Sequence, residues 1–220
     1  MALLARRITH LVAGLLAASV VLVATARAAD PPPPPSAQPD LAAMAIGVKD
    51  LPRGATVTDQ GATKFPGAEA AYERSFELSR RAARKAGFEF LDSSVALFQD
   101  VPTASSLFAG VRRYFASSSG RRAVARETAR ELGIASRRVE VGTARNLQVG
   151  DDSFGLLVTA RMSRLTVREV IAMGRVDRVI AEVDTVRLGS TRNLMRRTRA
   201  MLGTSAQHIR AGLAPVLASR

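Results

Sequence analysis

Few side chains in this 220-residue chain combine a chemical type with a spacing that could support catalysis. His208 is the one histidine after residue 10, and the chain has no cysteine. Thiol nucleophiles, disulfides and zinc sites built on cysteines or histidine pairs are therefore excluded. A serine–histidine–aspartate triad would have to use His208, yet no Gly-x-Ser-x-Gly motif accompanies it. We interpret His208 as a partly buried structural histidine beside the apolar side of the last predicted helix.

Two pairs of acidic residues have a spacing that general acid–base catalysis could use. Asp151 and Asp152 follow a glycine and are typical of a turn. Glu182 and Asp184 share one face of a predicted strand with Arg178, because side chains alternate along a strand. We interpret that face as a solvent-exposed ladder of ion pairs, with a glycosidase-type pair of carboxylates as the alternative.

Motifs for cofactors are missing from the sequence. It contains neither the Gly-x-Gly-x-x-Gly motif of dinucleotide-binding proteins nor the glycine-rich phosphate-binding loop that ends in lysine. We therefore expect no catalytic residue, no cofactor and no metal site. A cell-envelope hydrolase that uses Glu182, Asp184 or His208 remains the alternative.

Positive charge is the remaining chemical signal, because 32 lysines and arginines stand against 19 acids. Cations cluster in five stretches, which begin at Arg80, Arg112, Arg121, Arg137 and Arg196. The candidate anion-binding residues lie on one side of the last predicted helix: Arg192, Arg196, Arg199 and Arg210. The alternative is a scattered arginine surface that reflects a GC-rich genome.

The N-terminus predicts export. Arg6 and Arg7 precede an apolar stretch at 11–23, and Ala26 and Ala28 form a small-x-small site, which is typical of a secretory signal peptide. The stretch is shorter than the roughly 18–20 residues that span a bilayer. We predict a signal peptide over 1–28 that is cleaved, with a retained membrane anchor as the alternative. Cleavage would remove three arginines and no acid, which lowers the net charge from +13 to +10.

A proline-rich linker is predicted to follow. Five consecutive prolines at 31–35 favour an extended polyproline II spacer that has no means of packing. We predict a linker over 29–45 and one exported domain over 46–220. The protein would then be secreted or held in the cell envelope.

Hydrophobic periodicity predicts an α+β domain. Alternating apolar and polar side chains predict strands at 72–78, 88–98, 139–144, 154–162, 167–173 and 176–186, the last two joined by a turn at Gly174 and Arg175. Helical spacing predicts a helix that starts at Asp100 and another over 121–132, with 79–87 as a basic connection. We expect a single domain with an antiparallel sheet of five or six strands and packed helices.

The last predicted helix, 190–216, is amphipathic. Ser190 or Thr191 can cap its start, and its apolar stripe is about 120° wide, the width of a helix that packs on a core. That stripe contains Leu194, Met201, Leu202, Ile209, Leu213 and Val216. We expect it to pack on the sheet; the alternative is a helix that lies on a membrane surface.

Several motifs resemble a loose group of uncharacterised exported α+β domains of GC-rich, actinobacterial-type bacteria. They are the Asp50-Leu-Pro-Arg-Gly opening, the Tyr72-Glu-Arg-Ser-Phe-Glu strand, the Ser94-Val-Ala-Leu-Phe strand and the late hairpin before a C-terminal helix. The order of elements is similar to that of PsbP-like lipoproteins and of the extracellular sensor domains of mycobacterial-type serine/threonine kinases. This chain lacks the lipobox cysteine of the first and the paired cysteines of the second. The resemblance implies a small accessory or binding domain and transfers no catalytic residue.

These observations favour an exported, non-catalytic binding or accessory domain that contacts an anionic component of the cell envelope. An export signal argues against nucleic acid as the partner of the basic charge. The expected partners are therefore an anionic envelope lipid, a wall polymer or an acidic protein. A hydrolase, or a carrier of a lipid or another small ligand, is the alternative.

Overall fold

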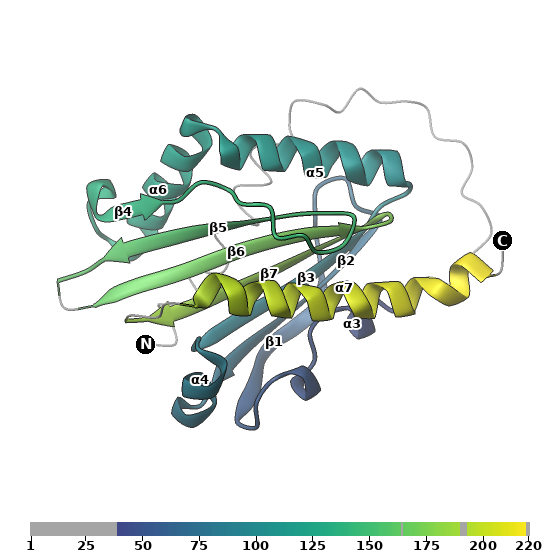
Figure 1. Ribbon diagram of the computed structural model, residues 1–220, viewed down its shortest axis with the longest axis horizontal. Helices are drawn as coiled ribbons and strands as arrows, with labels where there is room; N and C mark the ends of the chain where they lie inside the picture. Colours follow the sequence, from purple (N-terminus) through teal and green to yellow (C-terminus); the bar gives the residue numbers. More distant parts are fainter. Residues whose placement is uncertain (1–38, 164, 190–192, 219–220) are drawn as a thin grey trace.

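The computed structural model of the chain describes residues 39–163, 165–189 and 193–218, and leaves the side chains of 216–218 undescribed (Figure 1). The predicted signal peptide, the candidate caps Ser190 and Thr191, and Arg192 therefore lie outside the described residues. The described strands are β1 (Ala55–Thr63), β2 (Ala70–Leu78), β3 (Phe90–Leu97), β4 (Val139–Val141), β5 (Asp152–Arg161), β6 (Thr166–Val176) and β7 (Val179–Leu188). The described α-helices are α3 (Leu41–Met44), α4 (Arg80–Ala86), α5 (Val101–Ala116), α6 (Ser118–Leu132) and α7 (Leu194–Ala218).

The described strands form one antiparallel sheet in the order β1-β2-β3-β7-β6-β5-β4, which confirms the α+β class. The sheet has seven strands, so the prediction of five or six is wrong. The strand that the sequence did not predict is β1, an edge strand whose residues are all partly or fully exposed. Its sequence, ATVTDQGAT, lacks the strong apolar alternation of a half-buried strand.

The hairpin of β6 and β7 turns later than predicted. Val176 pairs with Val179, so the turn residues are Asp177 and Arg178, and Asp177 has the positive φ of 55° that such short turns require. Gly174 is instead a strand residue, paired with Ala181. A Cβ atom at Gly174 would come within 3.3 Å of Leu202 on α7. The glycine therefore allows α7 to approach β6 closely. Close approach of a neighbouring element, and not only a turn, is a reason for a glycine inside a strand.

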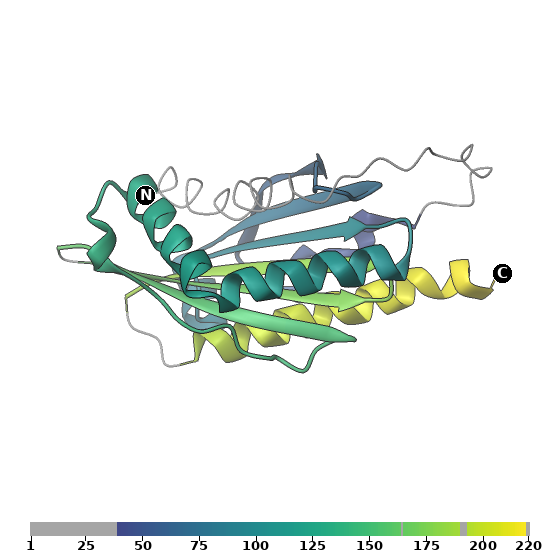
Figure 2. The same cartoon turned by 90° about the horizontal axis from the view of Figure 1, so that it is seen from above.

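Helices cover both faces of the sheet, as the two views of the ribbon show (Figures 1 and 2). One apolar cluster joins Val170 and Val183 to α7 and also includes side chains of α3 and α4. The other joins Ile171 and Ile180 to α5 and α6. Because neighbouring residues of a strand point to opposite faces, these two clusters lie on opposite sides of β6 and β7.

Helix α7 docks on the sheet through its apolar stripe, as expected. Leu194, Leu202, Ile209 and Leu213 are buried, and Met201 packs against the same cluster. A buried hydrogen bond between the hydroxyl groups of Thr185 on β7 and Thr198 on α7 adds a polar contact to the apolar interface.

Helix α3 extends the folded part of the chain into the segment 29–45 that was predicted as a linker. Met44 is fully buried, and its carbonyl oxygen accepts a hydrogen bond from Ser205 Oγ on α7 (3.2 Å). A Cβ atom at Gly212 would lie 2.6 Å from Met44 Cε. Close packing against α7 thus holds this short helix in place.

Ser117 ends α5 and begins α6. Its backbone N–H donates to Arg113 O and Tyr114 O, while its Oγ accepts a hydrogen bond from Gly120 N (2.9 Å). A Cβ atom at Gly120 would lie 2.0 Å from Tyr114 O. The sharp corner that lays α5 and α6 over different strands therefore depends on a capping serine and a glycine.

Replacement of Ile209 by aspartate is expected to unfold the domain, because the fully buried side chain would be exchanged for a charge without a partner. The matched control is Arg210→Asp, one residue further along and on the exposed side of α7. Circular dichroism and thermal melting measure both variants. A folded Ile209→Asp protein that only failed to bind membranes would mean that α7 is an interfacial helix.

Candidate functional site

The predicted anion-binding residues of the last helix are exposed but spread out. Arg196, Arg199 and Arg210 lie on the solvent side of α7. Arg196 and Arg210 are 14 positions apart, which corresponds to about 21 Å along a helix. These cations therefore form a stripe along α7 and do not converge on one small ligand.

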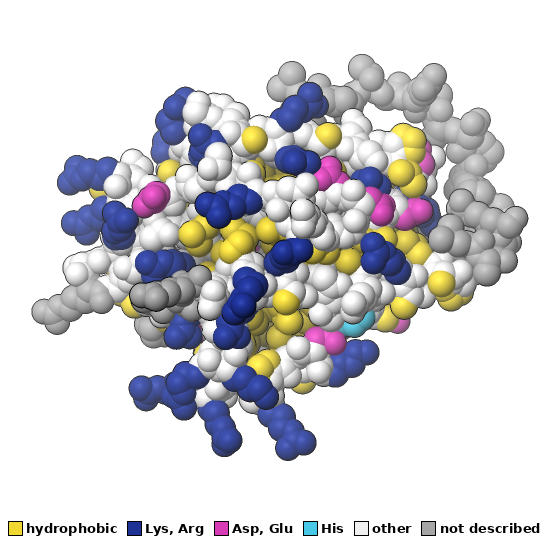
Figure 3. All heavy atoms as spheres, viewed as in Figure 1, with side chains coloured by type: hydrophobic (Ala, Val, Ile, Leu, Met, Phe, Trp, Pro, Cys, Tyr) yellow, Lys and Arg dark blue, Asp and Glu magenta, His cyan; other side chains and the backbone are white. Residues whose placement is uncertain are grey.

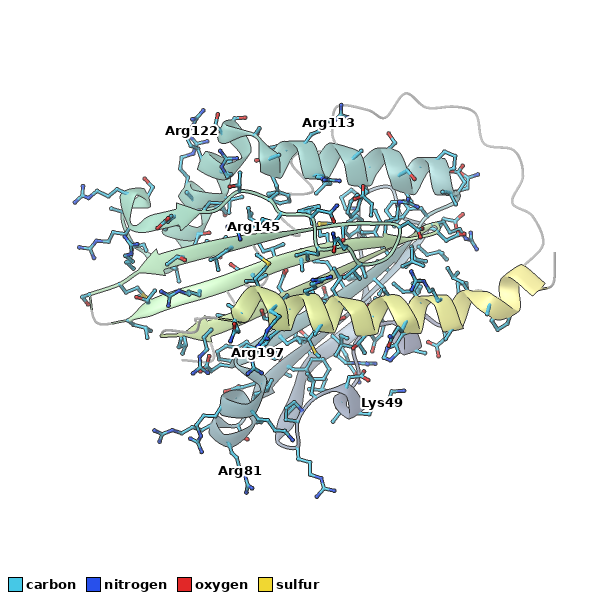
Figure 4. The ribbon with its side chains drawn as sticks, viewed as in Figure 1. Lys49, Arg81, Arg113, Arg122, Arg145 and Arg197 are labelled. Carbon is cyan, nitrogen blue, oxygen red and sulfur yellow. The ribbon has the colours of Figure 1, made fainter. Side chains whose placement is uncertain are left out.

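A denser group of cations lies on α4, which the sequence analysis took for a connection. The helix has the sequence RRAARKA, and its four cations are all exposed: Arg80, Arg81, Arg84 and Lys85. We call these four residues the α4 cations. Within the described residues none of them forms an ion pair or a side-chain hydrogen bond. Figure 3 shows basic side chains projecting from the edge of the molecule where α4 lies, and Figure 4 shows Arg81 pointing away from it.

Local sequence explains why this cationic segment is a helix. Ser79 caps the start by accepting a hydrogen bond from Ala82 N, and Gly87 ends the helix with a φ of 86°. Ala82, Ala83 and Ala86 form a narrow buried side that packs in the α7-side cluster. The capping serine and the closing glycine are both visible in the sequence, and they are the signal that could have predicted α4.

Arg197 ties the end of α4 to α7. Its Nη1 donates to Lys85 O (2.8 Å) and Ala86 O (2.7 Å). These are carbonyl groups of the last turn, which otherwise lack partners within a helix. A Cβ atom at Gly87 would lie 2.5 Å from Arg197 Cδ, so the glycine also makes room for this arginine. The α4 cations are thereby fixed to the body of the domain.

Several arginines elsewhere are held by partners. Arg112 on α5 pairs with Asp152 (2.9 Å), and Arg187 pairs with Glu89 (2.8 Å). Arg178, predicted to share an ion-pair ladder with Glu182 and Asp184, instead lies 3.8 Å from Glu69 and donates to Phe98 O and Gln99 O. The α4 cations differ from these three arginines because none of the four has such a partner among the described residues, and they differ from the other exposed arginines because all four lie on one short helix.

His208 lies on α7 and is partly buried, in agreement with a structural role. Its Nε2 is 3.6 Å from Asp50 Oδ1, while Asp50 Oδ2 accepts a hydrogen bond from Gly47 N (2.7 Å). The pair therefore joins α7 to the chain before β1. Glu182 and Asp184 face the opposite side of the sheet, so the structure does not bring His208 together with them.

Glu182 and Asp184 are buried, so the prediction of a solvent-exposed ion-pair ladder is wrong. They share a face with Met173 and Ile171, which the register places directly opposite them, and both apolar partners belong to the cluster under α5 and α6. Glu169 on β6 faces the same side. Glu169, Glu182 and Asp184 are 2, 7 and 4% exposed, and we call these three residues the acidic cluster.

Burial changes the acid–base behaviour of the acidic cluster. Desolvation raises the pKa of Glu169 to about 8, and the negative charges of Asp92, Glu131 and Glu182 add to that shift. Desolvation also raises the pKa of Glu182 to about 7, against the lowering effect of a hydrogen bond with Asp184. The pKa of Asp184 lies well above its usual range, because of burial first and of the neighbouring carboxylates second.

Sequence reasoning identified the alternation along β7 but not its surroundings. Val179, Ala181 and Val183 do point to one side and Glu182 and Asp184 to the other. The sequence did not reveal that β7 is a central strand with helices on both sides. No described group of three or more histidine or acidic side chains is arranged to hold a metal ion.

Known proteins offer a distant comparison. No known protein family matches the chain, and neither does any curated protein. Among solved structures, the chain is similar to the extracellular domain of PknH from Mycobacterium tuberculosis, with a TM-score of 0.45 and 9% sequence identity. The alignment covers 78% of this chain and 99% of that one. A likeness this distant carries no information about function.

No described helix combines the length and the apolar character needed to cross a bilayer.

Replacement of Arg197 by methionine is expected to lower the free energy of unfolding by about 1–2 kcal/mol, because two charge-assisted hydrogen bonds are lost while an apolar stem remains. Arg196→Met is the control, since Arg196 is exposed and its side chain makes no hydrogen bond among the described residues. Chemical denaturation measures the energy, and hydrogen exchange should quicken at α4 in the first variant alone. Equal effects of the two changes would contradict the role given to Arg197.

Proposed function

We propose that this chain is an exported, non-catalytic binding domain that contacts an anionic surface of the cell envelope through the α4 cations. The observation that carries the proposal is the set of four exposed cations on one seven-residue helix, none with a partner among the described residues. Long cationic side chains fixed on a short helix present positive charge without the entropy of a flexible loop.

The shape of this surface favours an extended anion over a small one. The α4 cations project from a convex edge of the molecule (Figures 3 and 4). A small anion is usually held in a concave site with converging donors. A membrane leaflet of anionic phospholipid, by contrast, offers many headgroups to cations that fan out, and each lysine or arginine near such a surface contributes about 1 kcal/mol. We therefore favour anionic phospholipid headgroups as the ligand.

The stripe of Arg196 and Arg199 on α7 would add to this contact. These residues flank Arg197, which binds the carbonyl end of α4. Of the predicted residues of the last helix, Arg196 and Arg199 are then a secondary part of the surface, and the α4 cations are its main part.

Replacement of Arg81 and Arg84 by glutamine is expected to weaken binding to vesicles containing phosphatidylglycerol by about 30-fold, since two cations are lost from the contact. The matched control is Arg122→Gln with Arg126→Gln, which removes two exposed cations from α6 without a described partner. Sedimentation with vesicles at low salt measures binding. Vesicles of phosphatidylcholine alone measure any contribution of the apolar N-terminal stretch.

Three double variants, on α4, α6 and α7, and a second ligand decide the outcome. The proposal predicts a small loss for the α6 control and an intermediate loss for Arg196→Gln with Arg199→Gln. Equal losses for the α4 and α6 variants would mean that only net charge matters. Binding to soluble polyphosphate with no binding to anionic vesicles would identify a wall-type polymer as the ligand and overturn the choice of phospholipid.

A further inference from the structure

The acidic cluster places polar carboxyl groups beside apolar side chains, and it is not part of the proposed anion-binding surface. Glu169, Glu182 and Asp184 come from the two central strands β6 and β7 and point into an apolar layer. One oxygen atom of each side chain is buried and has no hydrogen-bond partner in the described structure. Burial of an ionised carboxylate under these conditions is costly, and such a group takes up a proton instead.

The neighbouring strand and the covering helix α6 add negative charge. Asp92 on β3 lies directly opposite Asp184 in the register, and Glu131 on α6 acts on Glu169. Thr128, one turn before Glu131, is a buried hydroxyl that has no hydrogen-bond partner among the described residues. On the side of β2, Glu73 lies beyond Ser94, which itself pairs with Glu182.

Four nearby arginines among the described residues are engaged elsewhere. Arg175 faces the same side of β6 as Met173, but its guanidinium binds Asp151 (3.3 Å) and the carbonyl oxygen of Asp177 (2.9 Å). Arg112 on α5 binds Asp152. On α6, Arg121 donates to Ala116 O and Arg130 binds Glu127. None of these interactions brings a positive charge to the acidic cluster.

We propose that Glu169, Glu182 and Asp184 form a proton-binding site that fastens the α5–α6 layer to the sheet when the carboxyl groups are protonated and loosens it when they ionise. Protonation removes the charge and supplies O–H donors, so carboxyl groups can bond to one another inside the layer. Ionisation instead places several negative charges in the same buried layer, beside Asp92 and Glu131, where each raises the pKa of its neighbours. Separation of α6 from the sheet relieves that repulsion by admitting water.

The direction of the pH dependence follows from the raised pKa values. A carboxyl group with a higher pKa in the folded than in the unfolded state binds protons more tightly when folded, so folding is favoured in acid. The stability is lost as the pH rises from the usual range near 4.5 through about 7 to 8, where Glu182 and Glu169 ionise. This is the reverse of the common case, in which ion-paired carboxylates are protonated and the protein unfolds in acid.

Thermal melting of the purified protein at about pH 5.5 and about pH 8.5 tests the proposal. The melting temperature is expected to fall by about 10 °C at the higher pH. The triple variant Glu169→Gln, Glu182→Gln and Asp184→Asn should melt at nearly the same temperature at both values, because its amides stay neutral. The matched control Glu140→Gln removes an exposed acid and should behave like the wild type.

Hydrogen exchange locates the effect. After correction for intrinsic rates, protection of the backbone amides in α5 and α6 should fall at least tenfold more than that in α7 between the two pH values. Equal loss in α7 would overturn the proposal of a local switch.

Three other results would overturn the proposal. The first is a wild-type melting temperature that does not fall with pH. The second is a triple variant that fails to fold at about pH 5.5, since neutral amides of nearly the same size should substitute for protonated carboxyls. The third is recovery of wild-type stability at high pH by added Ca²⁺, which would make the acidic cluster a cation site.

Discussion

Strand β7 is buried on both of its faces, and the rest of this structure depends on that constraint. It pairs with β3 on one side and β6 on the other, and helices cover both of its faces. The α7 face meets this constraint with Val179, Ala181, Val183 and one threonine that bonds to Thr198. The other face carries Glu182 and Asp184, so a strand whose position demands apolar side chains holds two carboxyl groups in the core. The molecule must keep them neutral or let water reach them.

Negative and positive side chains are therefore concentrated in different parts of the molecule. A chain with a net charge of +13 has acids in the layer between its sheet and α6, while the α4 cations extend into solvent at another edge. The outer charge suits attraction to an anionic surface, which acts over about a Debye length. The inner charge acts over a few ångströms and makes the packing of α5 and α6 sensitive to protons. The two features lie on different elements, so each can be altered without the other.

Strong periodicity predicted much of the fold, and weak or short patterns hid the rest. The alternation in 72–78 and 154–162 and the long stripe of α7 were enough to predict those elements, because a half-buried element must separate its polar and apolar side chains. The pattern of β1 is too polar, and α4 is too short, to give such a signal. Gly174 resembled a turn residue, because the close approach of Leu202 that favours a glycine there arises only from tertiary packing.

Alternation along β7 also predicted which residues share a face, but the strand order decides whether that face meets water. The α4 cations were visible as a basic stretch, whereas the acidic cluster became apparent only from the pairing of β6 with β7.

The protonation state of the acidic cluster tests the central claim most directly. Carbon-detected NMR of side-chain carboxyl groups, on protein labelled at glutamate and aspartate, follows each carboxyl as the pH is raised. The account predicts carboxyl signals that remain protonated at about pH 6 and titrate near pH 7 to 8, and that disappear in the triple variant with Glu169→Gln, Glu182→Gln and Asp184→Asn. Complete ionisation of every carboxyl group by about pH 5.5 in the folded protein would contradict it.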